Sequence, residues 1–265
     1  PFMYPTLNLG PFVFPTAGIV YLLGVWLSLT LIERAAKRLH LNIEATYGLV
    51  VTGLIAGFLG ARLLFVAEYW AAFQENLLGI IWPLTSGYNL WGGLFFGAAG
   101  AFFYGRYKRL PLWPTLDALT PGILTAFLTI SLADFLAGPG YGILTRMPWG
   151  ISVFGIRRHP VQLYEIFLGL LALLLWWRVS SAQVRDLSNP GGGRTFPGQS
   201  FLLTMSLYSA GRLFLDIFRD NAWITANGYH IIQIIALLAL LGCLVFLARH
   251  DSQKPAVGVQ ESHPE

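Results

Sequence analysis

Seven apolar segments, each close to the length of a membrane-spanning helix, alternate with shorter polar segments along the 265-residue chain. A helix needs about 20 apolar residues to cross the hydrocarbon core of a bilayer. The pattern therefore predicts an all-α membrane protein, built as a seven-transmembrane-helix bundle. The expected spans are residues 14–32, 47–66, 90–104, 116–136, 160–177, 201–218 and 229–247.

Charged residues are scarce, which favours the same class. Asp, Glu, Lys and Arg make up 11% of the chain, 55% of the residues are hydrophobic, and the mean hydropathy is +0.60. A soluble domain carries roughly a quarter of its residues as charges. We therefore expect one transmembrane domain over residues 1–248. A polar tail over residues 249–265 has no packing signal and is expected to be disordered.

The seventeen Lys and Arg residues are unevenly distributed between the two sides of the predicted bundle. If the N-terminus lies outside, eleven of them fall in cytoplasmic segments, three each in residues 33–46, 105–115 and 178–200 and two in residues 248–265. Cytoplasmic segments of membrane proteins are enriched in Lys and Arg. The N-terminus is therefore predicted to lie outside and the C-terminus in the cytoplasm. The formal charge of +4 then reflects topology, and no nucleic acid partner is expected.

Four polar side chains share one face of the sixth predicted span. Tyr208, Arg212, Asp216 and Arg219 follow one another at steps of four, four and three residues, which places them on one stripe of an α-helix. Such a stripe cannot face lipid. Two interpretations stay open. Arg212 and Asp216 form a buried ion pair that holds two helices together, or the arginine binds an anionic head group in a polar pocket.

Further polar residues fall at the predicted outer ends of the spans. They are Asn89, Asp134, Arg157, Arg158, His159, Gln162 and Glu165. A polar site that opens toward the outer leaflet accounts for this distribution. A transporter would need polar residues at several depths and usually has internal repeats, and neither feature is visible in the sequence. Arg62, near the outer end of the second span, is expected to snorkel to the interface or to reach this site.

Residues 158–165, with the sequence Arg-His-Pro-Val-Gln-Leu-Tyr-Glu, resemble the signature motif of the bacterial prolipoprotein diacylglyceryl transferases. Other segments resemble motifs of the same family and occur in the family's order. They are Gly60 with Arg62 and residues 87–93, 117–121, 148–150 and 208–219. The resemblance extends over nearly the whole chain. It implies seven membrane helices, an N-terminus outside, and a place in the bacterial cytoplasmic (inner) membrane.

That family transfers the diacylglyceryl group of phosphatidylglycerol to the cysteine thiol of a lipoprotein signal peptide. The resemblance therefore implies an anionic phospholipid and such a peptide as partners, without a cofactor or a metal. The reaction needs a thiolate and a pocket that neutralises the departing glycerol phosphate. By resemblance, Arg212 is expected to hold the phosphate as a catalytic residue. The residues expected to bind substrate are Tyr208, Asp216, Arg219, Arg158, Gln162 and Arg62.

Three positions depart from the family pattern. Trp91 stands where the family has a histidine, Ser131 where it has an arginine, and Asp134 where it has an asparagine. An indole cannot take up a proton. A carboxylate at position 134 repels a lipid phosphate unless Arg212 or Arg146 pairs with it.

These departures leave two interpretations open. In the first, the chain is a divergent transferase in which His159 or Asp134 supplies the catalytic base and Arg146 or Arg158 replaces the missing arginine. In the second, it is a catalytically degenerate relative that binds lipid as an accessory subunit of a membrane complex.

Overall fold

The computed structural model describes residues 5–10, 12–74, 77–81, 87–138, 140–153, 155–188, 195–220, 222–225 and 227–251 of the chain. These residues are mostly helical and form two compact units. Unit 1 consists of residues 1–26 and 123–265, and unit 2 of residues 27–122. Helices α1 (Thr16–Arg38) and α6 (Leu112–Ala137) contribute residues to both units.

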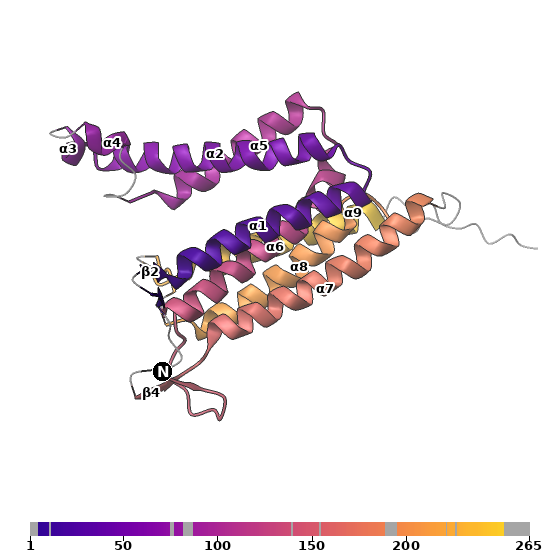
Figure 1. Cartoon of the computed structure of the whole chain (residues 1–265). Helices are drawn as coiled ribbons and strands as arrows, with labels where there is room; N and C mark the ends of the chain where they lie inside the picture. Colours follow the sequence, from indigo (N-terminus) through magenta and orange to yellow (C-terminus); the bar gives the residue numbers. More distant parts are fainter. Residues whose placement is uncertain are drawn as a thin grey trace, which may run out of the picture. The chain divides into compact units, whose positions relative to one another are not determined.

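Unit 1 contains the end of α6 together with α7 (Val161–Ser188), α8 (Gln199–Leu215), the 3-10 turn η1 (Asp216–Phe218) and α9 (Ile231–Asp251). Helix α8 packs against both α7 and α9 (Figure 1). Glycines let the backbones approach closely, since a Cβ on Gly169 would lie 2.7 Å from Leu128 and one on Gly211 would lie 2.4 Å from Leu168. These contacts bring α6, α7 and α8 together around the polar residues described below.

Two short antiparallel hairpins, which the hydrophobic pattern did not predict, also belong to unit 1. Strand β1 (Thr6–Leu9) pairs with β2 (Phe12–Pro15), and β3 (Ile151–Val153) pairs with β4 (Ile156–Arg158). The second hairpin lies directly before α7 in the chain (Figure 1). The all-α class holds for the helical bundle, and the hairpins are additions at its ends.

Unit 2 is built around α2 (Ile43–Glu68) and α5 (Leu90–Tyr107), with the short helices α3 (Trp70–Phe73) and α4 (Leu78–Ile81) between them in the chain. Helices α2 and α5 run antiparallel along their glycine faces. A Cβ on Gly57 would lie 3.0 Å from the Gly93 carbonyl oxygen and 3.4 Å from the Gly97 Cα. Small residues at such a face let two membrane helices pack backbone to backbone.

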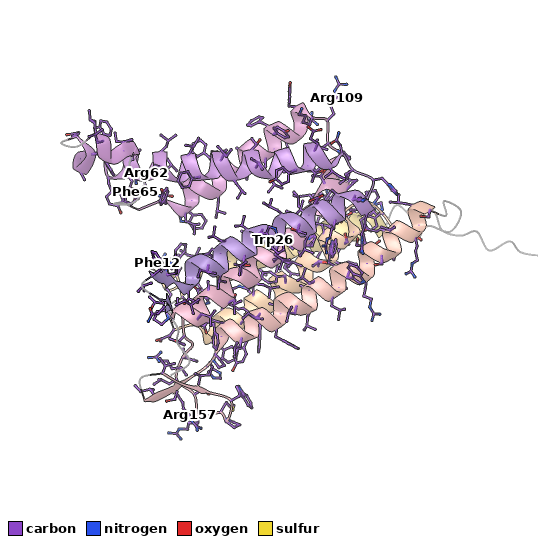
Figure 2. All side chains as sticks on the ribbon, viewed as in Figure 1. Phe12, Trp26, Arg62, Phe65, Arg109 and Arg157 are labelled. Carbon is purple, nitrogen blue, oxygen red and sulfur yellow. The ribbon has the colours of Figure 1, made fainter. Side chains whose placement is uncertain are left out.

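The chain is a multi-pass membrane protein. Within the described residues, six helices are long and apolar enough to cross a bilayer, namely α1, α2, α6, α7, α8 with η1, and α9. Their outer surfaces carry large apolar side chains such as Trp26, which is 66% exposed (Figure 2). Helix α5, the third predicted span, has 18 residues and is not among the six. The count of seven spans and the orientation of the termini therefore stay predictions.

The helices also extend beyond the predicted spans. Helix α7 continues to Ser188, past the expected end at residue 177, and α9 continues to Asp251. The predicted tail at 249–265 therefore begins inside a helix, and its residues 252–265 lie outside the described part of the chain.

Candidate functional site

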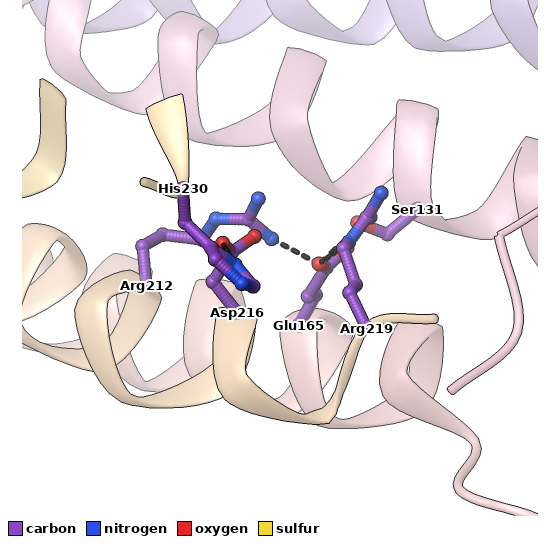
Figure 3. A network of polar contacts seen from close by, with 6 residues as sticks. All are labelled: Ser131, Glu165, Arg212, Asp216, Arg219 and His230. Atoms are coloured by element: carbon purple, nitrogen blue, oxygen red, sulfur yellow. Dashed lines mark hydrogen bonds and ion pairs between the residues drawn. The ribbon is translucent and has the colours of Figure 1, made fainter. Parts of the chain in front are cut away.

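Glu165, in the first turns of α7, is the meeting point of charged side chains from several elements of unit 1. Arg212 of α8 pairs with its Oε1 through Nη1. Arg219, which follows η1, donates from Nε and Nη2 to the same oxygen at 3.1 and 2.8 Å, and from Nη2 to Oε2 at 3.0 Å. Ser131 of α6 donates its hydroxyl to Oε2 at 2.7 Å. Figure 3 shows these side chains converging on one carboxylate. We call Ser131, Glu165, Arg212 and Arg219 the Glu165 cluster.

The Glu165 cluster is largely removed from solvent. The Glu165 side chain is 3% exposed, and the side chains of Arg212 and Arg219 are 15% and 18% exposed. Two guanidinium groups share one carboxylate, so the cluster carries one positive charge in excess. Arginine in a dry site binds phosphate and carboxylate groups through charge-assisted hydrogen bonds, and this arrangement is therefore suited to an anion.

Gly140, in the loop after α6, lies close to Arg219 of the cluster and to two further polar residues, Asp134 and Gln162. A Cβ on Gly140 would lie 3.8 Å from Asp134 Oδ2, 3.8 Å from Gln162 Nε2 and 3.9 Å from Arg219 Nη1. Gly140 has φ +85°, a conformation that favours glycine. The charge of Asp134 interacts with those of Arg219 and Glu165. Arg219 is therefore the cation whose charge acts on Asp134, where the sequence suggested Arg212 or Arg146.

Tyr208 lies beside the Glu165 cluster, as its place on the predicted stripe requires. Its ring stacks on Phe127 with centroids 4.9 Å apart and planes 12° apart. Its hydroxyl is close enough to interact electrostatically with Arg212, Glu165 and Arg219. The structure thus brings together Asp134, Gln162, Tyr208, Arg212 and Arg219 of the predicted site residues.

The ion pair between Arg212 and Asp216, one of the two interpretations left open for the stripe, does not form. Arg212 pairs with Glu165, while Asp216 Oδ2 lies 2.9 Å from Nδ1 of His230 (Figure 3). Asp216 keeps the helical position four residues after Arg212, since its N–H donates to Arg212 O. Each side chain instead pairs with a group outside α8, Arg212 with Glu165 of α7 and Asp216 with His230 before α9.

His230 is a residue that the sequence analysis missed. It directly precedes α9, and the short segment around it is held by hydrogen bonds from Ile231 N to Trp223 O at 2.9 Å and from Thr225 N to Tyr229 O at 2.9 Å. A single histidine before an apolar run has no spacing pattern to mark it. Its position at the start of the predicted apolar span, residues 229–247, was the only signal available.

His159 and Arg158 directly precede α7 and are not part of the Glu165 cluster. We call the region around them the rim of the site. His159 Nδ1 is 3.1 Å from the Tyr164 hydroxyl, and its ring packs on Phe218. Arg158 donates to Asp220 Oδ2 at 2.5 Å and to the Gly142 carbonyl oxygen at 3.2 Å. In the part of the chain that the structure describes, neither side chain forms a hydrogen bond or an ion pair with the Glu165 cluster.

The segment that begins at Tyr141 fixes this rim. Gly142 N donates to His159 O at 2.9 Å and Ile143 N donates to Phe218 O at 2.8 Å, so the segment joins the start of α7 to the end of η1. A Cβ on Gly142 would lie 2.7 Å from both His159 O and Phe218 O, which leaves room for glycine alone. Burial raises the pKa of Tyr141 above its ordinary value, so this phenol stays protonated at neutral pH and is no candidate base.

A sequence model of the family described as prolipoprotein diacylglyceryl transferase matches residues 5–249. The chain belongs to this family. It is similar to the phosphatidylglycerol–prolipoprotein diacylglyceryl transferases of three bacteria. They are those of Chloroflexus aggregans (26% identical over 283 residues, 96% of this chain and 90% of the relative), Clostridioides difficile (24% over 230 residues, 86% and 87%) and Mycobacterium leprae strain Br4923 (27% over 264 residues, 91% and 78%). The resemblance drawn from residues 158–165 is thereby confirmed.

Two of the departures from the transferase family pattern, both in α6, can now be placed in the structure. Ser131, where the motif led us to expect an arginine, uses its hydroxyl to bind the Glu165 carboxylate. The position therefore still contributes to the cluster, but without a charge. Asp134, the second departure in α6, lies where its charge interacts with Arg219.

Arg62 and Trp91 belong to unit 2. Arg62 lies on α2 (Figure 2), and its guanidinium donates to the backbone oxygens of Ile80 and Gly87 at 3.0 Å each and to that of Gly79. The residue is 7% exposed, so it holds the chain around α4 instead of snorkelling to the interface. Trp91 is half exposed in the first turn of α5. Among the described residues, no three His, Cys, Asp or Glu side chains are grouped closely enough to hold a metal ion.

Proposed function

We propose that the chain transfers a diacylglyceryl group from an anionic phospholipid such as phosphatidylglycerol to the cysteine thiol of a lipoprotein signal peptide. The Glu165 cluster carries this proposal, because two buried arginines share one carboxylate and keep one positive charge for an anion. The names of the relatives support the same substrates. The proposal makes the cluster the place where the lipid phosphate binds.

The reaction requires the protein to stabilise the leaving phosphate and to accept the thiol proton. The thiol loses its proton, and the sulfur forms a bond to the glycerol carbon that carries the phosphate. The carbon–oxygen bond to that phosphate breaks, and its electrons leave with glycerol phosphate. Arg212 and Arg219 stabilise the charge of the leaving group, which is the usual role of guanidinium groups at a transferring phosphate. A base must receive the thiol proton.

The other predicted site residues have supporting roles in this proposal. Tyr208 and Gln162 donate hydrogen bonds to the lipid head group beside Arg212. Asp216, whose side chain is 0% exposed, links the backbones of Arg212 and Arg219 and does not touch the lipid. Arg158 at the rim attracts anionic lipid, whereas the buried Arg62 of unit 2 holds the chain around α4. For the base, the sequence offers His159 and Asp134.

The proposed function also requires an orientation. We propose that the protein lies in the bacterial cytoplasmic membrane with its N-terminus outside and its C-terminus in the cytoplasm. Helix α7 then begins at the outer surface, and Glu165, five residues into that helix, lies in the outer half of the bilayer. A signal peptide that follows its lipoprotein outward would meet the site from that side.

A second function remains a candidate because of Asp134. Its charge interacts with Arg219 and Glu165, so the two carboxylates can balance the two arginines and weaken the attraction for a phosphate. Ser131 adds no charge. A protein with such a site could bind lipid without transferring it and act as an accessory subunit of a membrane complex.

The deciding experiment measures transfer of a labelled diacylglyceryl group from phosphatidylglycerol to a signal-peptide cysteine by the purified full chain in detergent. We expect turnover, and we expect Arg212→Ala to reduce it by about 100-fold, the usual cost of losing one charge-stabilising donor. Arg185→Ala, at an exposed arginine near the end of α7, is the matched control and should keep the activity.

The outcomes separate the candidates. Turnover that is lost in Arg212→Ala but kept in Arg185→Ala supports the transferase. An inactive protein that still retains phosphatidylglycerol through purification, and loses it in Arg212→Ala, contradicts the transferase and supports the accessory subunit. An inactive protein that retains no anionic lipid contradicts both functions.

A further inference from the structure

A carboxylate and an imidazole form a second polar pair beside the Glu165 cluster. Asp216 Oδ2 and His230 Nδ1 are 2.9 Å apart. Asp216 lies between Arg212 and Arg219 in the chain, where its backbone N–H donates to Arg212 O and its carbonyl oxygen accepts from Arg219 N at 3.2 Å. Figure 3 shows His230 and Asp216 in one view with both arginines and Glu165.

The pair fixes the protonation pattern of the imidazole. An ionised carboxylate accepts hydrogen bonds and donates none. The hydrogen on His230 must therefore sit on Nδ1, where it is donated to Asp216. In a neutral imidazole the other ring nitrogen, Nε2, then carries a lone pair and can accept a proton.

The two members of the pair differ in burial, with Asp216 buried and His230 partly exposed. The Asp216 side chain is 0% exposed and that of His230 is 28% exposed. A substrate group can therefore reach the imidazole but not the carboxylate. In the described part of the chain the second Asp216 oxygen, Oδ1, has no hydrogen-bond partner, so the hydrogen bond to His230 is made by Oδ2 alone.

The backbone around His230 is held on both sides. Ile224 and His230 form an antiparallel bridge, and the His230 carbonyl accepts the N–H of Ile234 at 3.2 Å as α9 begins. The backbone position of His230 is therefore fixed, as is the hydrogen-bond partner of its ring. A general base needs both, because its lone pair must point at the proton it removes.

We propose that His230 is the general base of the transfer reaction, oriented by Asp216. This inference rests on the proposed function, since it names the group that receives the thiol proton. The proton moves from the substrate sulfur to His230 Nε2 while the sulfur bonds to the glycerol carbon. The carbon–oxygen bond breaks, and glycerol phosphate leaves with the electron pair, against Arg212 and Arg219. The imidazolium next to Asp216 then releases the proton to the phosphate or to water.

The two bases suggested by the sequence have poorer surroundings. His159 places its Nδ1 against the Tyr164 hydroxyl and its ring on Phe218, and no carboxylate fixes its tautomer in the described residues. Asp134 lies near Arg219 and Glu165, and no hydrogen bond from a described residue orients its carboxylate. His230 combines a free ring nitrogen with a carboxylate that stabilises the charge formed on it.

The test compares transfer by the full chain and by His230→Gln across pH, with labelled phosphatidylglycerol and a lipobox peptide. At pH 7 we expect the variant to turn over about 100-fold more slowly, which is within the usual contribution of a general base. Without a base the thiol must ionise alone, and an ordinary cysteine has a pKa near 8.5. The ratio of parent to variant rate should therefore fall below about tenfold at pH 9. The charged groups around the pair, Arg212, Arg219 and Glu165, are the same in both proteins.

Two more variants keep the proposal testable if His230→Gln folds poorly. His230→Ala should regain turnover when imidazole is added, because free imidazole can enter the vacated space and act as the base. Asp216→Asn should slow turnover because the amide can donate to Nδ1, which moves the ring hydrogen to Nε2. The control is His250→Gln, at the far end of the same helix, where the ring packs on Phe196; it should keep the parent rate at every pH.

The failures are distinguishable. If the parent is active and His230→Gln stays within threefold of it at pH 7, the assignment of His230 is wrong and the transferase function stands. A large loss with the same ratio at every pH, and no rescue by imidazole, makes His230 a structural residue and overturns the inference. No turnover by the parent contradicts the proposed function, and the inference falls with it.

Discussion

At the scale of single residues, Glu165 is the counterion on which the arginines of unit 1 depend. Its side chain is 3% exposed and binds both Arg212 and Arg219. We expect Glu165→Gln to lower the free energy of unfolding by about 3 kcal/mol, because it removes the carboxylate that two buried guanidinium groups share. Thermal or denaturant unfolding of the purified protein in detergent measures this loss.

Glu68→Gln makes the same chemical change at an exposed carboxylate that accepts a hydrogen bond from Asn89. An exposed polar contact contributes little, so this control should unfold within about 0.5 kcal/mol of the parent. Equal unfolding of the two variants would show that the arginines do not need Glu165.

Ser131 makes a smaller contribution to the same carboxylate. Its hydroxyl donates to Glu165 Oε2 at 2.7 Å, and that oxygen also accepts from Arg219 at 3.0 Å. Ser131→Ala should therefore cost about 1.5 kcal/mol of unfolding free energy, the low end for a hydrogen bond to a charged group. Ser188→Ala, at an exposed serine that bonds to Val184 O, is the matched control, and a cost no larger at Ser131 than there would argue against the bond.

The residue scale also separates what the sequence could predict from what it could not. A charge inside an apolar run identified Arg212 and Arg219, because burial of a charge in a bilayer is costly wherever the helix packs. The partner of Arg212 was missed, since helical spacing compares residues of one helix and Glu165 lies 47 residues away in α7. His230 was missed because one histidine forms no pattern.

At the scale of helices and strands, the positions of the helices followed from hydropathy and their ends did not. Helix α7 has 28 residues, which makes it about 42 Å long, whereas the hydrocarbon core is about 30 Å thick. Hydropathy detects only the part inside the core. The polar residues that continue the helix toward Ser188, and the short hairpins β1–β2 and β3–β4, lie in water or at the interface, where apolar runs are not required.

The glycine face between α2 and α5 gives a prediction at the same scale. A Cβ on Gly57 would lie 3.0 Å from the Gly93 carbonyl oxygen, so a leucine there must push the two backbones apart. We expect Gly57→Leu to lower the unfolding free energy by about 1–3 kcal/mol, the usual cost of overpacking. Unfolding in a denaturing detergent titration measures the change.

Gly242→Leu is the control for this substitution. Gly242 lies in α9, and no described atom lies within 4 Å of a Cβ built there. Leucine is a better helix former than glycine by several tenths of a kcal/mol, so this variant should be neutral or slightly more stable. A loss in Gly242→Leu as large as that in Gly57→Leu would mean that helix packing is not the cause.

At the scale of the whole molecule, membrane class and family were predictable because they rest on signals spread along the chain. Composition, repeated apolar segments and the order of motifs each average over many residues, and the family match over residues 5–249 agrees with them. Orientation in the membrane depends on the same kind of signal, the distribution of Lys and Arg. It can be tested with one helix.

Helix α7 offers a marker at each end. Arg157 precedes it in β4 and Arg185 lies near its C-terminal end, and both side chains are exposed. The single native cysteine, Cys243, is buried in α9, so Cys243→Ser provides a background for labelling. In spheroplasts, a membrane-impermeant maleimide should label Arg157→Cys directly and Arg185→Cys only after permeabilisation.

The labelling result also bears on function, because Glu165 lies in the first turns of α7, near the Arg157 end. A lipoprotein precursor carries its cysteine toward the outer surface, so the site must open to that side to act on it. Labelling in the reverse order would place the Glu165 cluster in the inner half of the bilayer and contradict both the predicted orientation and the proposed substrate. Labelling of both positions without permeabilisation would mean that α7 does not cross the membrane, which the apolar length of the helix argues against.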